Sequence, residues 1–167
     1  MMQGIWHAGL HVADIERSIV FYRDLLGLRL VHRQESRSPY ISQLVGFDDA
    51  HLLVAQLALP NRPQPAASSH DIELVQYLSP RGSASPARRC DPGTAHLAFT
   101  VGDIDATYTR LCVHGVRFVG PPARITAGVN TGGATCYFLD PDDHTLELVQ
   151  PPERQPLRTG RQENAGP

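Results

Sequence analysis

The sequence predicts an α+β fold, in which two βαβββ modules form a cup-shaped, partly open mixed β-sheet with helices on its outer face. The first evidence is a repeat: residues 6–27 (WHAGLHVADIERSIVFYRDLLG) are echoed by residues 94–115 (TAHLAFTVGDIDATYTRLCVHG). A second echo pairs HDIELVQ at 70–76 with HTLELVQ at 144–150. Because motifs that recur in the same order indicate duplicated structural units, the chain is predicted to contain one unit twice.

In the first module, alternating apolar residues predict a strand at 5–12, and a helix follows it. Asp14 is a good N-cap, because its carboxylate can accept hydrogen bonds from the first free backbone amides. An apolar stripe at helical spacing comes next, and Gly27 can end the helix in the left-handed conformation. Three further strands and a short helix complete the module; the strands are predicted at 28–34, 52–59 and 71–78, and the short helix at 39–45.

The second module repeats this order of elements. A strand at 95–101 precedes a helix that begins at Asp103 and ends at Gly115. Further strands are predicted at 116–119, 135–139 and 145–150, with a loop-rich stretch at 120–133 and a turn at 140–143. The predicted boundaries are therefore 1–79 for the first module, 80–94 for a linker, 95–150 for the second module and 151–167 for a flexible tail.

Composition excludes several classes of function. A formal charge of -2 and a pI near 6.4 give no electrostatic basis for nucleic-acid binding. No apolar run is long enough for a membrane span, and the N-terminus lacks the features of a signal peptide. The three cysteines lack metal-ligand spacing, so we expect free thiols and a cytoplasmic protein. All 15 basic residues are arginine, which excludes a lysine Schiff base.

The repeats place two histidines and two glutamates at matching positions. His7 lies near the start of the first module and Glu73 near its end, and His96 and Glu147 occupy the same places in the second. Side chains alternate between the two faces of a strand, so all four point away from the apolar face that packs on the helices. The four side chains are therefore predicted to meet inside the cup.

Two imidazoles and two carboxylates suit a borderline divalent cation. The carboxylates neutralise its charge, and neutral imidazoles are good donors to zinc, nickel, cobalt, iron or manganese. One such ion is expected for each site of His7, Glu73, His96 and Glu147. A single histidine or glutamate on a strand is usually not a ligand, but the duplicated pattern favours a metal site.

Other side chains near the predicted cup have two interpretations. His11 and Tyr77 share the faces of His7 and Glu73, and they are either substrate contacts or structural residues. The basic cluster is either an anion-binding flap or an ordinary solvated loop; it comprises Arg81, Arg88 and Arg89. The remaining histidines are assigned no function because they lie at strand ends, in turns or near a helix end; they are His32, His51, His70, His114 and His144.

The chain resembles the vicinal-oxygen-chelate superfamily, which includes glyoxalase I, methylmalonyl-CoA epimerase, extradiol dioxygenases, fosfomycin-resistance transferases and bleomycin-resistance proteins. The resemblance covers about residues 4–151. It rests on WHAGLHVADIERSIVFYRDLLGL, DIELVQYLSP, GTAHLAFTVGDIDATYTRL and YFLDPDDHTLELVQP. The family turn usually has glycine at the position of Asp143, but aspartate tolerates the left-handed conformation.

The resemblance implies paired βαβββ modules around one metal, with the ligand positions at His7, Glu73, His96 and Glu147. This ligand set is similar to that of glyoxalase I and the epimerases. It implies a metal-dependent epimerase or isomerase that moves a proton next to a carbonyl through a metal-stabilised enolate or enediolate, with Glu147 as the base and Glu73 as a second candidate. The substrate would be an acyl-CoA, a keto-sugar or a cyclitol.

Two alternatives to this assignment remain. One is a glyoxalase I-type lactoylglutathione lyase, and the other is a non-catalytic small-molecule-binding protein of the same fold. In this superfamily the cup closes within one chain or across two chains. A homodimer is expected, without a particular pairing of its modules.

Overall fold

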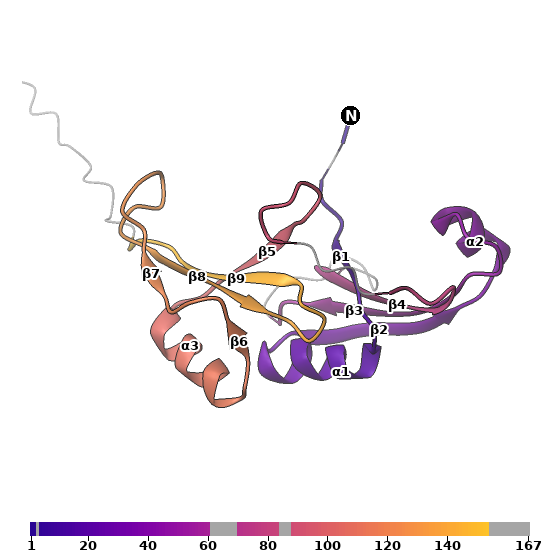
Figure 1. Cartoon of the computed structure of the whole chain (residues 1–167), viewed down its shortest axis with the longest axis horizontal. Coiled ribbons are helices and arrows are strands. Elements are labelled where there is room, and N and C mark those ends of the chain that lie inside the picture. Colours follow the sequence, from indigo (N-terminus) through magenta and orange to yellow (C-terminus); the bar gives the residue numbers. More distant parts are fainter. Residues whose placement is uncertain (3, 61–69, 84–87, 154–167) are drawn as a thin grey trace, which may run out of the picture.

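The computed structural model describes residues 1–2, 4–60, 70–83 and 88–153. The predicted polar loop at 61–69, the middle of the predicted linker and the predicted tail from residue 154 onward lie outside the described residues. The described part contains two mixed sheets, of four and five strands, and no closed barrel (Figure 1). The predicted α+β fold with two repeated modules is confirmed, and each module contributes one of the two sheets.

The first sheet has the strand order β1-β4-β3-β2. β1 is parallel to β4, and the other neighbours are antiparallel. This order puts the first and last strands of the module side by side, because the chain crosses over the sheet through the first helix. The strands are β1 (Ala8–His11), β2 (Arg29–Ser36), β3 (His51–Ala58) and β4 (Ile72–Ser79).

The second sheet repeats that arrangement with the order β5-β9-β8-β6. β5 is parallel to β9, as β1 is to β4. A fifth strand, β7, pairs with β8 inside the stretch that the sequence had indicated as loop-rich. The strands are β5 (His96–Thr100), β6 (Arg117–Phe118), β7 (Ala123–Arg124), β8 (Ala134–Leu139) and β9 (Thr145–Gln150).

The two crossover helices begin in the same way. The Asp14 carboxylate accepts hydrogen bonds from the amides of residues 16 and 17, and the Asp103 carboxylate accepts one from residue 106. The side-chain oxygen of Gln76 accepts a bond from the Ile15 amide at 2.9 Å, and that of Gln150 accepts one from the amide of residue 104 at 2.8 Å. The repeated glutamines thus join the last strand of each module to the first turn of its helix.

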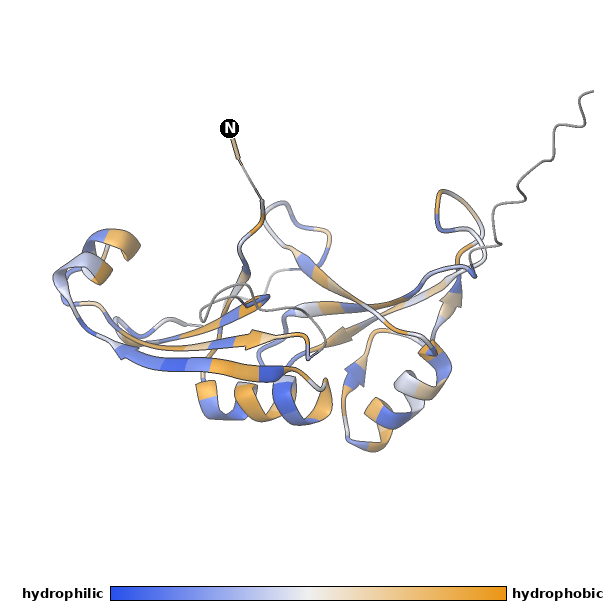
Figure 2. Cartoon of the chain, turned by 180° about the vertical axis from the view of Figure 1, so that it is seen from behind, coloured by the Kyte–Doolittle hydropathy of each residue, from blue (hydrophilic) through white to orange (hydrophobic). Residues whose placement is uncertain are grey.

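Helices cover one face of the two sheets. α1 (Ile15–Val20) continues into a π-helical segment, η1 (Phe21–Leu25), and lies beneath the first sheet, while α3 (Ile104–Val113) lies beneath the second (Figures 1 and 2). The predicted short helix is present as α2 (Pro39–Val45) at the far end of the first module. No helix in the described ranges is long and apolar enough to cross a membrane.

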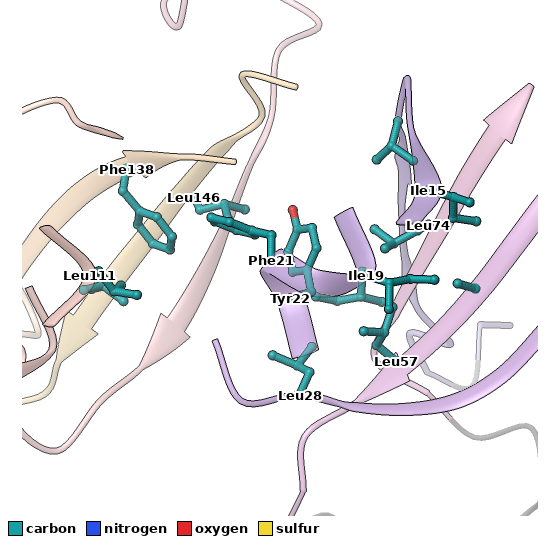
Figure 3. Packing of buried hydrophobic residues seen from close by; sticks show 14 of the residues in the cluster. Ile15, Ile19, Phe21, Tyr22, Leu28, Leu57, Leu74, Leu111, Phe138 and Leu146 are labelled. Carbon is teal, nitrogen blue, oxygen red and sulfur yellow. The ribbon is translucent and has the colours of Figure 1, made fainter. Parts of the chain in front are cut away.

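A single apolar core runs beneath both sheets and joins the modules. In Figure 3, Phe21 and Tyr22 of η1 lie between the first module and the residues Phe138 and Leu146 of the second. The Tyr22 hydroxyl donates a hydrogen bond to the Asp140 carboxylate at 2.8 Å, and both side chains are buried. The helix faces of the modules therefore pack together. The opposite faces of the sheets, apart from the end of the first sheet that α2 covers, remain open for a site.

The cysteines differ in their surroundings, and we expect them to differ in reactivity toward thiol reagents. Cys90 and Cys112 are exposed, whereas Cys136 is buried in the core. Burial raises the pKa of the Cys136 thiol to about 11, so it stays protonated at neutral pH. Because the thiolate is the reactive form, a thiol reagent should label Cys90 and Cys112 but not Cys136 at about pH 8. Mass spectrometry of the labelled native protein checks this; rapid labelling of Cys136 would contradict its placement.

Candidate metal centre

The first predicted pair is assembled by β1 and β4. Gly9 on β1 lies in register with Glu73 on the parallel neighbour β4, and His7 comes just before β1. This pairing brings the His7 Nε2 atom to 3.8 Å from the Glu73 Oε1 atom. Gln56, directly opposite Glu73 on β3, donates a hydrogen bond to the Glu73 Oε2 atom at 3.2 Å. The carboxylate is thus held from the neighbouring strand and faces the histidine.

The second pair is assembled in the same way by β5 and β9. Glu147 lies in register with Ala98, two residues after His96, and the His96 Nε2 atom is 3.2 Å from the Glu147 Oε2 atom. The Thr135 hydroxyl, on β8, donates a hydrogen bond to the other oxygen of Glu147. The Tyr137 ring packs edge-on against His96 with 5.3 Å between ring centroids. Each module therefore presents one histidine and one supported carboxylate.

Within one chain the two pairs do not form a common cluster. Among the described residues, the group close enough to share an ion consists of His7, His70 and Glu73, whose ligand atoms lie within 4.8 Å of one another. His96 and Glu147 are not part of that group. We call His7, His70 and Glu73 the first half-site, and His96 with Glu147 the second half-site.

His70 is a member of the first half-site that the sequence analysis had assigned no function. Its side chain is 1% exposed, and its Nε2 atom lies 3.4 Å from the Glu73 Oε2 atom. Its ring stacks on His7 with 4.7 Å between ring centroids and 22° between ring planes. Strand alternation does not reveal this contact, because residues three apart in a regular strand point to opposite faces. His70 precedes β4, where the backbone has not yet entered that alternation.

Residues 4–148 match the Glyoxalase/Bleomycin resistance protein/Dioxygenase superfamily. The chain belongs to this superfamily. A lactoylglutathione lyase of Haemophilus influenzae is 30% identical over 87% of this chain and 91% of its own length. The glutathione transferase FosA of Serratia marcescens is 31% identical over 89% of this chain and 81% of its own length. A glyoxalase family protein of Bacillus cereus, at 22% identity, has the same fold with a TM-score of 0.75, covering 91% of this chain and 96% of that one.

The donor atoms of this superfamily member fit a borderline divalent cation. Each half-site combines imidazole nitrogen with carboxylate oxygen, the ligand types that zinc, nickel, cobalt, iron and manganese accept. Glu73 is fixed by Gln56, and Glu147 by Thr135. Outer contacts of this kind orient metal ligands and keep them in place for the ion.

Aromatic side chains of β1 and β4 lie beside the first half-site. His11 packs edge-on against Tyr77 at 5.5 Å between ring centroids, and Tyr77 packs against Phe47 at 6.1 Å. Tyr77 also borders a small second core beneath α2, made by Ile41, Ala50, Leu52, Val54 and Val75. His11 and Tyr77, the two residues named from the sequence as substrate contacts, therefore lie together, next to this small apolar core. Their role in binding stays a prediction.

The three arginines of the basic cluster are in different situations. Arg88 makes hydrogen bonds to the Asp91 carboxylate through its backbone amide and its guanidinium. Arg89 instead borders a pocket of about 80 Å³ with His96 and Tyr137 of the second half-site. Arg81 makes neither contact in the described part of the chain. Of the cluster, only Arg89 is positioned to reach a ligand at that histidine.

Proposed function

We propose that this protein is a metal-dependent epimerase or isomerase that moves a proton next to a carbonyl group of a small molecule. The observation that carries the proposal is the duplicated histidine–glutamate pair, with each carboxylate held by a polar neighbour on the adjacent strand. A bound divalent cation would polarise the carbonyl and stabilise negative charge on its oxygen. The protein's own contribution is a carboxylate base beside that position.

The surroundings of the two carboxylates favour Glu147 as the base. One oxygen of Glu73 is 3.2 Å from the Gln56 amide nitrogen and 3.4 Å from His70, so this carboxylate is constrained by two groups. Glu147 is held through one oxygen by the Thr135 hydroxyl, and its other oxygen faces His96. A carboxylate with fewer constraints can leave the ion more easily to accept a proton. Glu73 then serves mainly as a ligand.

We further propose that two chains complete the site. The shared core joins the modules through their helix faces, and the half-sites of one chain stay separate. In a twofold dimer, the first half-site of one copy can face the second half-site of the other. Such a dimer would contain two equivalent sites, each with His7 and Glu73 from one chain and His96 and Glu147 from its partner.

Co-expression of two inactive variants tests this pairing. One chain carries His7→Ala with Glu73→Gln, and the other carries His96→Ala with Glu147→Gln. If sites form between chains, random pairing gives heterodimers in half of the population, each with one intact site. Activity should return to about a quarter of the wild-type value. If each site forms within a single chain, no activity should return. A monomer in light scattering would also contradict the proposed pairing.

A glyoxalase I-type lyase is the second candidate, and the relatives favour it. The lactoylglutathione lyase of Haemophilus influenzae is 30% identical to this chain over most of both lengths. A direct test measures solvent deuterium incorporation next to the carbonyl of candidate substrates, with and without glutathione. Exchange without glutathione supports the epimerase or isomerase, whereas exchange that requires a glutathione hemithioacetal supports the lyase. A non-catalytic binding protein would show no exchange with any candidate.

A further inference from the structure

We propose that His70 is itself a metal ligand, so that the first half-site binds a divalent cation with three side chains of one chain. This inference rests on the metal dependence proposed above and goes beyond it in one respect. The ligand set expected from the repeats has two members in each half, whereas the structure has three in the first. His7, His70 and Glu73 would then be sufficient to bind the ion, and the second half-site would supply further ligands.

The distances within the first half-site are close to those of a metal site. Two ligands on one zinc-like ion, with bonds of about 2.0–2.2 Å, are separated by at most roughly 4.4 Å. The Glu73 Oε2 atom lies 3.4 Å from the His70 Nε2 atom, and the Glu73 Oε1 atom lies 3.8 Å from the His7 Nε2 atom. With one ligand atom taken from each residue, the three fall within 4.8 Å of one another. Side-chain adjustments of a few tenths of an ångström would bring the three onto one ion.

The surroundings of His70 hold its ring at the half-site. The His70 side chain is 1% exposed, with the His7 ring stacked on one side and the Trp6 ring edge-on at 6.4 Å. A buried ring packed between two aromatic rings loses little further freedom when it binds an ion. The ligand set would also be two histidines and one carboxylate, which leaves positions open on the ion for the second half-site and a substrate.

His70 and its equivalent in the second module make different contacts. Its counterpart in the second module is His144, the first residue of HTLELVQ. The Nε2 atom of His144 is 2.8 Å from the backbone oxygen of His11, and it does not face Glu147. Equivalent histidines therefore have different partners: His144 contacts the backbone of the first module, and His70 contacts Glu73. Only the first half-site has a third donor of this kind among the described residues.

The experiment measures the contribution of His70 to metal binding independently of the second half-site. Chelator-treated protein is titrated with Co²⁺ and Zn²⁺, using visible absorption and calorimetry, and no substrate is needed. The starting variant carries His96→Ala and Glu147→Gln, which disables the second half-site. His70→Ala and His70→Gln are then added separately. His114→Ala is the control, because His114 is exposed at the end of α3, on the helix side of the second sheet, and its ring contacts the Arg110 backbone oxygen.

The starting variant should still bind about one ion per chain. Adding His70→Ala or His70→Gln should weaken that binding by roughly 100-fold, because losing a ligand should cost at least as much as the roughly 10–100-fold cost of losing an outer contact. His114→Ala should leave the affinity unchanged. The inference is overturned if the starting variant binds no ion while the wild type does, or if both His70 replacements leave its affinity unchanged. A wild-type protein that binds no ion would instead refute the proposed function.

A second measurement needs no variant and so does not depend on how His70 replacements fold. In Co²⁺-loaded wild-type protein, each coordinated imidazole with an N–H gives a strongly shifted proton signal in NMR. We expect three such signals, from His7, His70 and His96. Two signals, with His70 absent, would contradict the inference even if the variants had lost affinity for another reason.

Discussion

Replacing Glu147 with glutamine should lower turnover and solvent proton exchange by roughly 100-fold or more, the range expected for loss of a general base. Gln keeps an oxygen that can bind a cation and can still accept the Thr135 hydrogen bond, but it cannot take a proton at neutral pH. The variant should therefore retain most of its metal. Deuterium exchange and elemental analysis on the same preparation measure both quantities.

Glu73→Gln is the matched comparison for this prediction. It removes the same charge from the equivalent strand position of the first sheet, next to Gln56 and His70. If Glu73 is mainly a ligand, exchange should fall less than in Glu147→Gln, and metal affinity should fall more. The opposite pattern, with proton exchange intact in Glu147→Gln and lost in Glu73→Gln, would show that Glu73 is the base and Glu147 mainly a ligand.

The repeats predicted the strands and the two histidine–glutamate pairs, because each pair depends only on contacts within a module. Glu73 meets His7 through the parallel pairing of β4 with β1, and Glu147 meets His96 through the same pairing of β9 with β5. Any sequence that folds as this unit must place the members of a pair near each other. Local pattern and module topology were sufficient for that conclusion.

The relation between the pairs could not be predicted in this way, because it depends on packing between modules. The core that contains Tyr22 and Phe138 joins the modules by their helix faces and keeps the half-sites of one chain apart. Both residues have an apolar pattern that predicts only that they are buried. Which module they pack against is decided by three-dimensional fit. The same limit applies to His70, whose contact with Glu73 arises outside the regular strand.

The contacts between modules can be tested at Asp140, which is the buried acceptor that joins them. Its carboxylate accepts the Tyr22 hydroxyl at 2.8 Å and the backbone amides of Asp142 and His144 at 2.9 Å each. Asp140 is 1% exposed, so Asp140→Ala leaves the Tyr22 hydroxyl without its acceptor in the core and removes the acceptor of two part-buried amides. The free energy of unfolding should fall by about 3–5 kcal/mol, since each unsatisfied buried group costs about 1–3 kcal/mol.

Two variants at the same junction show whether this loss belongs to the buried network. Tyr22→Phe removes one hydrogen bond and should cost about 1 kcal/mol, because the ring still fills the core. Asp143→Gly lies in the same turn at an exposed position with φ of 69°, which glycine adopts readily, so the free energy of unfolding should hardly change. Chemical denaturation of all three measures the differences. An Asp140→Ala protein as stable as Asp143→Gly would show that the buried Tyr22–Asp140 contact adds little to the packing between the modules, and that Asp140 serves mainly to shape the turn.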